Sequence, residues 1–223
     1  MRWARDNGLG LFFGAILLAA LVGQALVGHS GFNHDALAHQ GATISLWRYV
    51  TSSSFMADVM ENWQSEYLQF TLYVLATVWF VQRGSTESKQ PGEAGLESDE
   101  KQMIGEHAKP NSPRLAKVGG WRTAVYSNSF VLVMGSIWLS TWAAQGIAGR
   151  IDYNASQLDH RLAPLALWQY LGSSDFWDRT LQNWQSEFLA VATFSLFSVY
   201  LRQRGSAESK PVGAPHSATG MEG

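Results

Sequence analysis

Two long apolar segments set the strongest limit on how this chain can fold. Leu9 to Val27 is an almost unbroken run of about 19 residues, and Phe130 to Ala148 is a second run of this kind. A helix rises about 1.5 Å per residue, so each run is long enough to cross a bilayer core about 30 Å thick. Two shorter apolar runs are Tyr67 to Val81 and Phe188 to Leu201. The sequence therefore predicts an all-α integral membrane protein with four transmembrane helices.

The second half of the chain resembles the first half. A shift of about 121 residues aligns residues 7–89 with residues 128–210 without a gap, with roughly 30 identities in about 80 positions. The pentapeptide Asn-Trp-Gln-Ser-Glu occurs in both halves, at 62–66 and at 183–187. Each copy contains two predicted spans, an even number, so both copies enter the membrane in the same direction. We predict two tandem helical hairpins that form a parallel repeat.

The predicted domain boundaries follow this repeat. Residues 1–89 form the first two-span repeat and residues 121–210 form the second. The segment 90–120 between them is rich in Glu, Lys, Gly, Ser and Pro, which is typical of a flexible linker. Residues 211–223 are predicted to be a disordered tail.

Basic residues are concentrated at one end of the predicted spans. That end holds Arg2, Arg5, Arg83, Lys89, Lys117, Arg122, Arg202, Arg204 and Lys210, and the loops between paired spans hold Arg48, Arg150, Arg161 and Arg179. The positive-inside rule then places both termini and the central linker in the cytoplasm, although three arginines in the second loop weaken the signal.

Each loop leads into a short amphipathic segment before the chain re-enters the membrane. These segments are Ser45–Val50 and Ala166–Leu171, and they are expected to lie at the membrane interface. A helix of about 30 residues should then begin at each serine pair, Ser52-Ser53 and Ser173-Ser174, which offer N-caps, and continue through the pentapeptide. The tryptophans predicted to anchor the interface are Trp47, Trp63, Trp168 and Trp184.

Helix lengths predict a polar layer inside the membrane. Counting back from Arg202 and Arg83 places Glu187 and Glu66 about 22 to 25 Å from the cytoplasmic boundary. A similar count along the other spans gives a comparable depth for two glutamines, and two asparagines lie one turn further out. The predicted intramembrane polar layer consists of Gln24, Asn62, Glu66, Gln145, Asn183 and Glu187.

Two interpretations of this layer remain open. A charge within the membrane is costly and usually faces the bundle interior or water, so Glu66 and Glu187 could bind a proton or a cation. Alternatively, both carboxylates lie at a locally thinned interface, and Gln24 and Gln145 only form hydrogen bonds between helices. The structural interpretation carries more weight.

Composition and motifs exclude several classes of protein. The chain has no cysteine, which excludes disulfides, thiolate catalysis and zinc–thiolate sites, and its formal net charge of −2 comes without a basic stripe for nucleic acid. The predicted spans contain no histidine to ligate a haem, and His39 and His160 recur in the loops without a metal-binding spacing. Phosphate-loop, nucleophile-elbow and zincin motifs are also missing from the sequence. We therefore expect no enzyme activity, no cofactor and no metal.

Three motifs carry a resemblance to a known family. They are the segment Arg5-Asp6-Asn7-Gly8-Leu9, the repeated Asn-Trp-Gln-Ser-Glu-[Phe/Tyr]-Leu, and the repeated Gln-Arg-Gly-Ser-x-Glu-Ser-Lys. Apart from the linker and tail, the chain resembles an uncharacterised bacterial inner-membrane protein family, domain of unknown function 6766. The resemblance implies a location in the bacterial cytoplasmic (inner) membrane and brings no assigned activity.

The expected function is that of a non-enzymatic scaffold or accessory protein. Its partners would be the lipid bilayer and either itself or another membrane protein. The alternative is a small cation or proton channel or transporter that uses Glu66 and Glu187. Four spans are few for a monomeric pore, so that alternative requires an oligomer.

Overall fold

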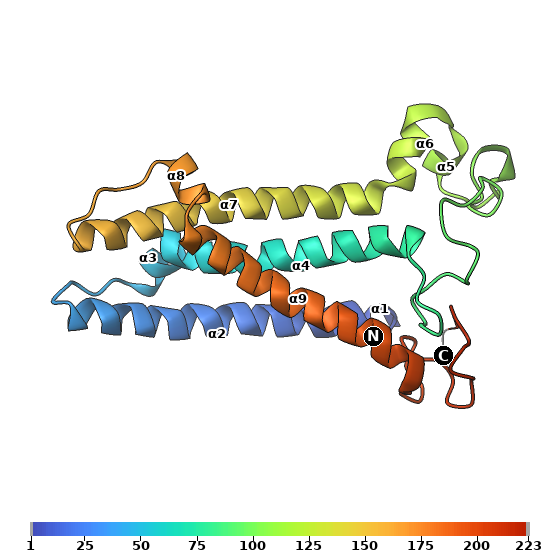
Figure 1. Ribbon diagram of the computed structural model, residues 1–223, viewed down its shortest axis with the longest axis horizontal. Helices are drawn as coiled ribbons and strands as arrows, with labels where there is room; N and C mark the ends of the chain where they lie inside the picture. The colour runs from blue at the N-terminus through green and yellow to red at the C-terminus, as the bar shows by residue number, and fades with distance from the viewer. Residues whose placement is uncertain (1, 222–223) are drawn as a thin grey trace. The chain divides into compact units, whose positions relative to one another are not determined.

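The computed structural model describes residues 2–221, a part of the chain that is mostly helical and contains no β-strand (Figure 1). The all-α fold class is therefore confirmed for this part of the chain. The long helices are α2 (Gly8–Ala38), α4 (Ser53–Trp79), α7 (Ser129–Asp159) and α9 (Ser174–Tyr200). The short helices are α1 (Arg2–Asp6), α3 (Leu46–Val50), the 3₁₀ helix η1 (Gly105–His107), α5 (Arg114–Lys117), α6 (Gly120–Ser127) and α8 (Leu167–Leu171).

Among the described helices, α2 and α7 are long and apolar enough to cross a membrane, judged by length and composition. The expectation that four helices meet this standard is wrong for α4 and α9. Both have 27 residues, but the polar pentapeptide and its neighbours occupy the first part of each helix. The apolar stretch that remains is too short to cover the hydrocarbon core without polar side chains.

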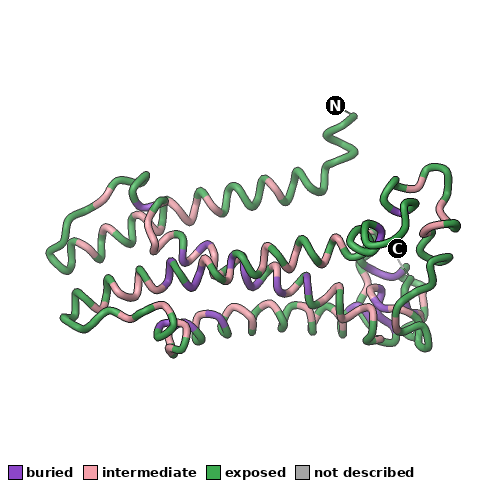
Figure 2. Tube along the Cα trace, turned by 90° about the horizontal axis from the view of Figure 1, so that it is seen from above, coloured by how far each residue is buried: buried purple, intermediate pink, exposed green. Residues whose placement is uncertain are grey.

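Helix α2 exposes apolar side chains along its whole length. It contains no buried residue, and Figure 2 shows it in the colours of exposed and intermediate positions. Leu9 is 75% exposed and Leu18 is 65% exposed. Exposed apolar area costs about 25 cal/mol per Å² in water, and large exposed apolar surfaces are typical of regions that contact lipid or another protein.

The chain forms two compact units that do not coincide with the sequence repeats. The first unit comprises residues 1–60 and 144–173, and the second comprises residues 61–143 and 174–223. Each unit therefore contains segments from both halves of the chain. The boundaries proposed from the sequence, 1–89, 90–120, 121–210 and 211–223, stay predictions.

An asparagine near the end of each hairpin's first helix holds the returning chain in the first unit. The Asn154 side chain donates from Nδ2 to the Leu165 carbonyl at 2.9 Å and accepts from the Leu165 amide at Oδ1 at 2.8 Å. Asn33 forms the same pair with Ile44, at 3.0 and 2.8 Å. One side chain thus satisfies both polar groups of a residue eleven positions later, in a loop where no regular ladder can do so. We call these two pairs the asparagine clasps.

A buried tyrosine packs against a glycine in each hairpin. Tyr49 is 4% exposed and Tyr170 is 1% exposed. A Cβ atom at Gly28 would collide with the Tyr49 hydroxyl, and one at Gly149 would lie 2.5 Å from the Tyr170 hydroxyl. Only glycine leaves room for the phenol at these two points. Burial raises the pKa of Tyr49, and Asp58 and Asp152 raise it further.

The chain is locally helical just before the second long helix of each repeat, and the interface location expected for these segments stays a prediction. Both amphipathic segments contain a short helix, α3 and α8. Helix α4 begins at Ser53 and α9 begins at Ser174, and the Ser52 hydroxyl accepts a hydrogen bond from the Phe55 amide at 3.3 Å. These predicted helix starts are confirmed.

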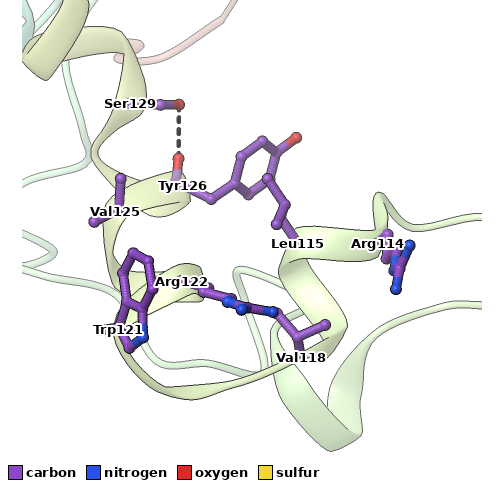
Figure 3. A pocket seen from close by; sticks show the side chains of 8 residues that line it. All are labelled: Arg114, Leu115, Val118, Trp121, Arg122, Val125, Tyr126 and Ser129. Atoms are coloured by element: carbon purple, nitrogen blue, oxygen red, sulfur yellow. Dashed lines mark hydrogen bonds between the residues drawn. The ribbon is translucent and has the colours of Figure 1, made fainter.

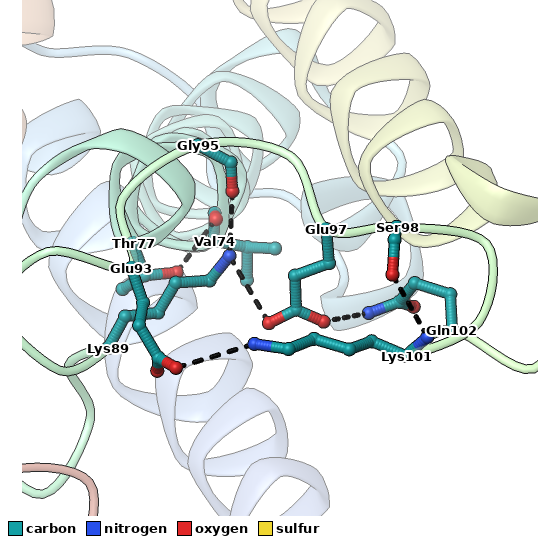
Figure 4. Close-up of polar contacts among 9 residues, drawn as sticks. All are labelled: Val74, Thr77, Lys89, Glu93, Gly95, Glu97, Ser98, Lys101 and Gln102. Atoms are coloured by element: carbon teal, nitrogen blue, oxygen red, sulfur yellow. Dashed lines mark hydrogen bonds and ion pairs between the residues drawn. The ribbon is translucent and has the colours of Figure 1, made fainter.

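The segment after α4 makes local polar contacts in the second unit (Figure 4). The Gly95 amide donates to the Val78 carbonyl at 2.7 Å, which ties this segment to the end of α4. Lys89 donates to the Gly95 carbonyl at 2.8 Å and lies 3.5 Å from Glu97. Lys101 and Glu93 form an exposed ion pair at 3.4 Å.

Lys210, the counterpart of Lys89 in the repeat, is buried instead. Its side chain is 1% exposed, and its Nζ donates to the carbonyls of Gly84, His216 and Ala218 at 2.6, 3.0 and 3.1 Å. An ammonium has three hydrogens, so these three bonds satisfy it completely. Burial lowers the pKa of Lys210, and the nearby Arg202 lowers it further.

The asparagine clasps predict a clear stability effect. Asn154→Asp keeps the side-chain shape but places a carboxylate against the Leu165 carbonyl, which loses its donor. We expect a loss of about 2 kcal/mol, visible as a melting temperature several degrees lower in detergent by circular dichroism. Asn128→Asp is the control, because the Asn128 side chain makes one exposed local bond, of 2.8 Å to the Ala124 carbonyl, that water can replace. Equal melting temperatures for the two variants would contradict the role of the clasp.

Candidate functional site

The pentapeptide segments of α4 and α9 meet in the second unit. Glu61 accepts from Arg179 at 3.1 Å and from the Asn183 amide at 2.7 Å, so one carboxylate binds two groups on the facing helix. Gln69 donates to the backbone carbonyl of Glu187 at 3.4 Å. We call this set of side chains, together with Gln64 and Trp184 below, the pentapeptide contact.

The charged part of this contact is shielded from solvent mainly on the α4 side. The side chain of Glu61 is 13% exposed and that of Arg179 is 36% exposed. Arg179 also lies 3.8 Å from Asp175 on its own helix. A charge pair that is partly removed from water is screened less by salt than a surface pair, so its Coulomb attraction is stronger.

A second hydrogen bond in the contact involves an indole. Trp184 donates from Nε1 to Gln64 Oε1 at 2.9 Å. Gln64 is 0% exposed and the neighbouring Ser65 is 1% exposed. The amide nitrogen Nε2 of Gln64 has no acceptor among the described residues. Burying an amide costs free energy unless its polar atoms are hydrogen-bonded. The bond from Trp184 therefore lowers the cost of burying the Gln64 side chain.

Aromatic rings continue the contact toward α7. Trp142 packs on Trp184, Phe176 and Trp177, each with ring centroids 6.1 Å apart, and stacks on Trp138 at 5.9 Å. These separations fall within the range at which aromatic pairs stabilise one another beyond their buried area. The aromatic rings therefore join α9 to the first part of α7.

Identical pentapeptides occupy different environments in the two helices. Gln64 and Ser65 are buried on α4, whereas their counterparts Gln185 and Ser186 are exposed on α9. The local backbone contact is the same in both, because Ser65 bonds the Asn62 carbonyl at 2.8 Å and Ser186 bonds the Asn183 carbonyl at 2.9 Å. The difference therefore arises from what each helix packs against, since the local sequence is the same.

The predicted polar layer is distributed over both units. Asn62, Glu66, Asn183 and Glu187 belong to the second unit, and Gln24 and Gln145 belong to the first. Gln145 is 2% exposed, and Gln24 is half-buried. Asn183 takes part in the pentapeptide contact, whereas Asn62 is exposed. The layer as a whole stays a prediction.

The two glutamates singled out by the sequence both belong to the second unit, Glu66 on α4 and Glu187 on α9. Glu66 is exposed and Glu187 is half-buried. Paired carboxylates of this kind attract protons and cations more strongly than a single carboxylate does. No group of three or more histidine and acidic side chains in the described part of the chain is arranged to hold a metal ion.

The four predicted anchor tryptophans fall into two groups. Trp47 on α3 and Trp168 on α8 are 77% and 80% exposed. Trp63 and Trp184 are half-buried, and Trp184 is committed to Gln64. Exposure of the first pair fits an anchoring role, which stays a prediction.

Sequence reasoning missed the ion pair between Glu61 and Arg179. It concentrated on positions that are identical in the two halves, and these two positions differ: Glu61 aligns with Gln182, and Arg179 aligns with Asp58. The available signal was the opposite charge at two aligned positions, Asp58 and Arg179. Both helices were expected to pass the same depth of the membrane, so their charges could meet. Complementary differences between the two halves point to contacts between them.

Comparison with known proteins identifies one family. A family model described as Domain of unknown function (DUF6766) matches residues 1–221. The resemblance inferred from the three sequence motifs is thereby confirmed. No curated protein and no solved structure matches the chain.

The ion pair of the pentapeptide contact can be measured with a double-mutant cycle. We expect Glu61→Gln and Arg179→Gln each to lower stability, and the double variant to lose less than the sum, with a coupling of about 1 kcal/mol. The control cycle uses Glu93→Gln and Lys101→Gln, an exposed pair whose coupling should stay below about 0.5 kcal/mol. Unfolding in detergent is followed by circular dichroism. A coupling no larger than that of the control pair would show that Glu61 and Arg179 do not stabilise the contact.

Proposed function

This chain belongs to the family described as a domain of unknown function, and from that premise we propose that it is a non-enzymatic membrane protein, a scaffold or accessory protein. Helices α2 and α7 cross the bilayer in this proposal. Their length and apolar composition support it, as does the absence of any buried residue in α2. The protein then presents its loops and short helices to partners at the membrane surface.

The observation that carries the scaffold role is how the pentapeptide segments use their polar groups. Glu61, Arg179 and Asn183 bind one another, and Gln64 binds Trp184. Polar side chains that satisfy one another between helices stabilise association where no water is available. A site for chemistry would instead leave a nucleophile or base facing a cavity. The contact therefore favours a rigid support over a reaction centre.

The distribution of basic residues supports a further proposal on topology. Both termini and the segment 90–120 lie in the cytoplasm of a bacterial cell, so α4 and α9 must return the chain across the membrane. The pentapeptide contact pairs some of the polar side chains in their first parts, and their apolar second parts face lipid. Without these contacts, the free energy of placing the polar half of each helix in the bilayer would be too unfavourable.

Because the chain lacks cysteine, single cysteines can report this topology. We expect Ala42→Cys and Ala163→Cys, in the two hairpin loops, to react with a membrane-impermeant maleimide on intact spheroplasts. Ala94→Cys should react only after the membrane is permeabilised. All three positions are exposed, which makes them matched probes. If Ala94→Cys reacts from the same side as Ala42→Cys, α4 does not cross the membrane.

A second candidate function rests on Glu66 and Glu187. Both side chains belong to the second unit, and two carboxylates held near each other favour binding of a proton or a cation. A small oligomeric channel or transporter would use this pair to select its ion. The exposure of Glu66 fits a group that faces a water-filled path or a neighbouring copy of the chain.

Flux through proteoliposomes separates the two functions. We expect the native protein to give no proton or potassium flux above protein-free vesicles, and Glu66→Gln with Glu187→Gln to give the same result. The control carries Glu93→Gln with Glu97→Gln, which removes the same charge from the linker. Flux that is present in the native and control proteins but lost from the Glu66 and Glu187 variant would overturn the scaffold role and establish the channel.

A further inference from the structure

The short helices α5 and α6 form a hairpin directly before α7. The Thr123 hydroxyl on α6 donates to the Leu115 carbonyl on α5 at 2.7 Å, and Thr123 is buried between them. The hairpin encloses an open pocket of about 550 Å³. Ser129, the first residue of α7, lines it, and its hydroxyl donates to the Tyr126 carbonyl at 2.7 Å (Figure 3).

Most of the pocket lining is apolar and exposed. Leu115 and Val118 come from α5 and the turn after it, and Trp121, Val125 and Tyr126 come from α6. Trp121 is 73% exposed, and the other four are between 37% and 49% exposed. Exposed apolar and aromatic side chains clustered on a short helix beside a span are typical of a segment that lies in the membrane interface.

Two arginines line the same pocket, and neither is neutralised. In the described part of the chain, no carboxylate forms an ion pair with Arg114 or Arg122. The side chains of Arg122 and Tyr126 extend from α6 toward Leu115 and Val118 (Figure 3). Lys117 is committed elsewhere, because its Nζ donates to the Pro110 carbonyl at 2.7 Å. Arg122 lies over the Trp121 ring, with its guanidinium carbon 5.7 Å from the ring centroid. The pocket thus combines two guanidinium groups that have no carboxylate partner with an apolar surface.

We infer that this pocket binds the headgroup of an anionic phospholipid, such as phosphatidylglycerol, at the membrane end of α7. Arg114 and Arg122 bind the phosphodiester, since guanidinium groups match phosphate oxygens in geometry and charge. The glycerol and the start of the acyl chains lie on Leu115, Val118 and Val125, while Trp121 and Tyr126 sit at headgroup level. This inference rests on the proposed membrane location and adds the lipid class that the protein holds.

The composition of the pocket favours a lipid over a soluble phosphate. A soluble ion makes no use of the five exposed apolar side chains, whereas a phospholipid uses both parts of the lining at once. Helix α7 is a candidate span and begins directly after Asn128. The pocket therefore lies at the boundary of that span. Juxtamembrane arginines gain most from anionic lipid within a Debye length of the surface.

Native mass spectrometry of the full chain in neutral detergent tests the inference. Added phosphatidylglycerol should be retained about tenfold better than phosphatidylcholine with the same acyl chains. Arg114→Gln with Arg122→Gln should reduce the preference to about one. Lys101→Gln with Lys109→Gln removes the same charge from the linker and should keep the native preference. Excess glycerol 3-phosphate should not displace the lipid, and circular dichroism checks that each variant is folded.

Each outcome bears on a specific part of the inference. Equal retention of the two lipids by the native protein, or an unchanged preference after loss of both arginines, overturns the headgroup site. Displacement by glycerol 3-phosphate overturns the lipid assignment in favour of a soluble phosphate ligand. Alkaline carbonate extraction of cell membranes is run in parallel. Release of the native protein by carbonate overturns the proposed membrane location together with the site, whereas retention with equal lipid binding overturns only the site.

Discussion

The asparagine clasps are the interaction on which the two turns of the first unit depend. A chain that leaves a 31-residue helix and turns back must satisfy backbone groups that have no helical partner. Asn33 and Asn154 do this at the same place in each hairpin, and a buried tyrosine against a glycine supports each turn. The turn geometry agrees as well, because Gln40 and Arg161 both have a φ of 60°. With the loop held in this way, the second long helix begins at an equivalent residue in both halves.

The polar groups that follow the turns are used differently in the two halves. Gln64 is buried and bonded to Trp184, whereas Gln185 is exposed. In an apolar environment an unpaired amide or carboxylate is far more costly than in water, so each such group needs a partner of its own. The pentapeptide contact supplies partners from the facing helix. We therefore interpret the polar residues of the pentapeptide contact as groups that hold α4 and α9 together.

The sequence predicts the fold better than it predicts the site. Apolar runs and serine caps located the long helices, and the starts at Ser53 and Ser174 needed only local capping rules. The number of helices apolar enough to span was overestimated, because short apolar runs after the pentapeptides were counted as complete spans. The Glu61–Arg179 pair was missed since it depends on which faces of two distant helices meet. Local patterns do not contain that information. The indication in the sequence is a difference between the two halves, such as Asp58 at the position that aligns with Arg179.

The charge differences between the halves also bear on how the chain avoids mispairing. If the halves arose by tandem duplication, two identical copies could pair with each other between chains as readily as within one chain. Asp58 in the first half aligns with Arg179 in the second half. If a first half took the place of the second half, Asp58 would therefore face Glu61, and two negative charges would meet. A second half in the place of the first would lose the carboxylate that binds Arg179 and Asn183, because Gln182 stands there instead. Both exchanges are penalised, so the pentapeptide contact selects pairing between unlike halves. This specificity explains why the ion pair occupies the positions where the two halves have diverged.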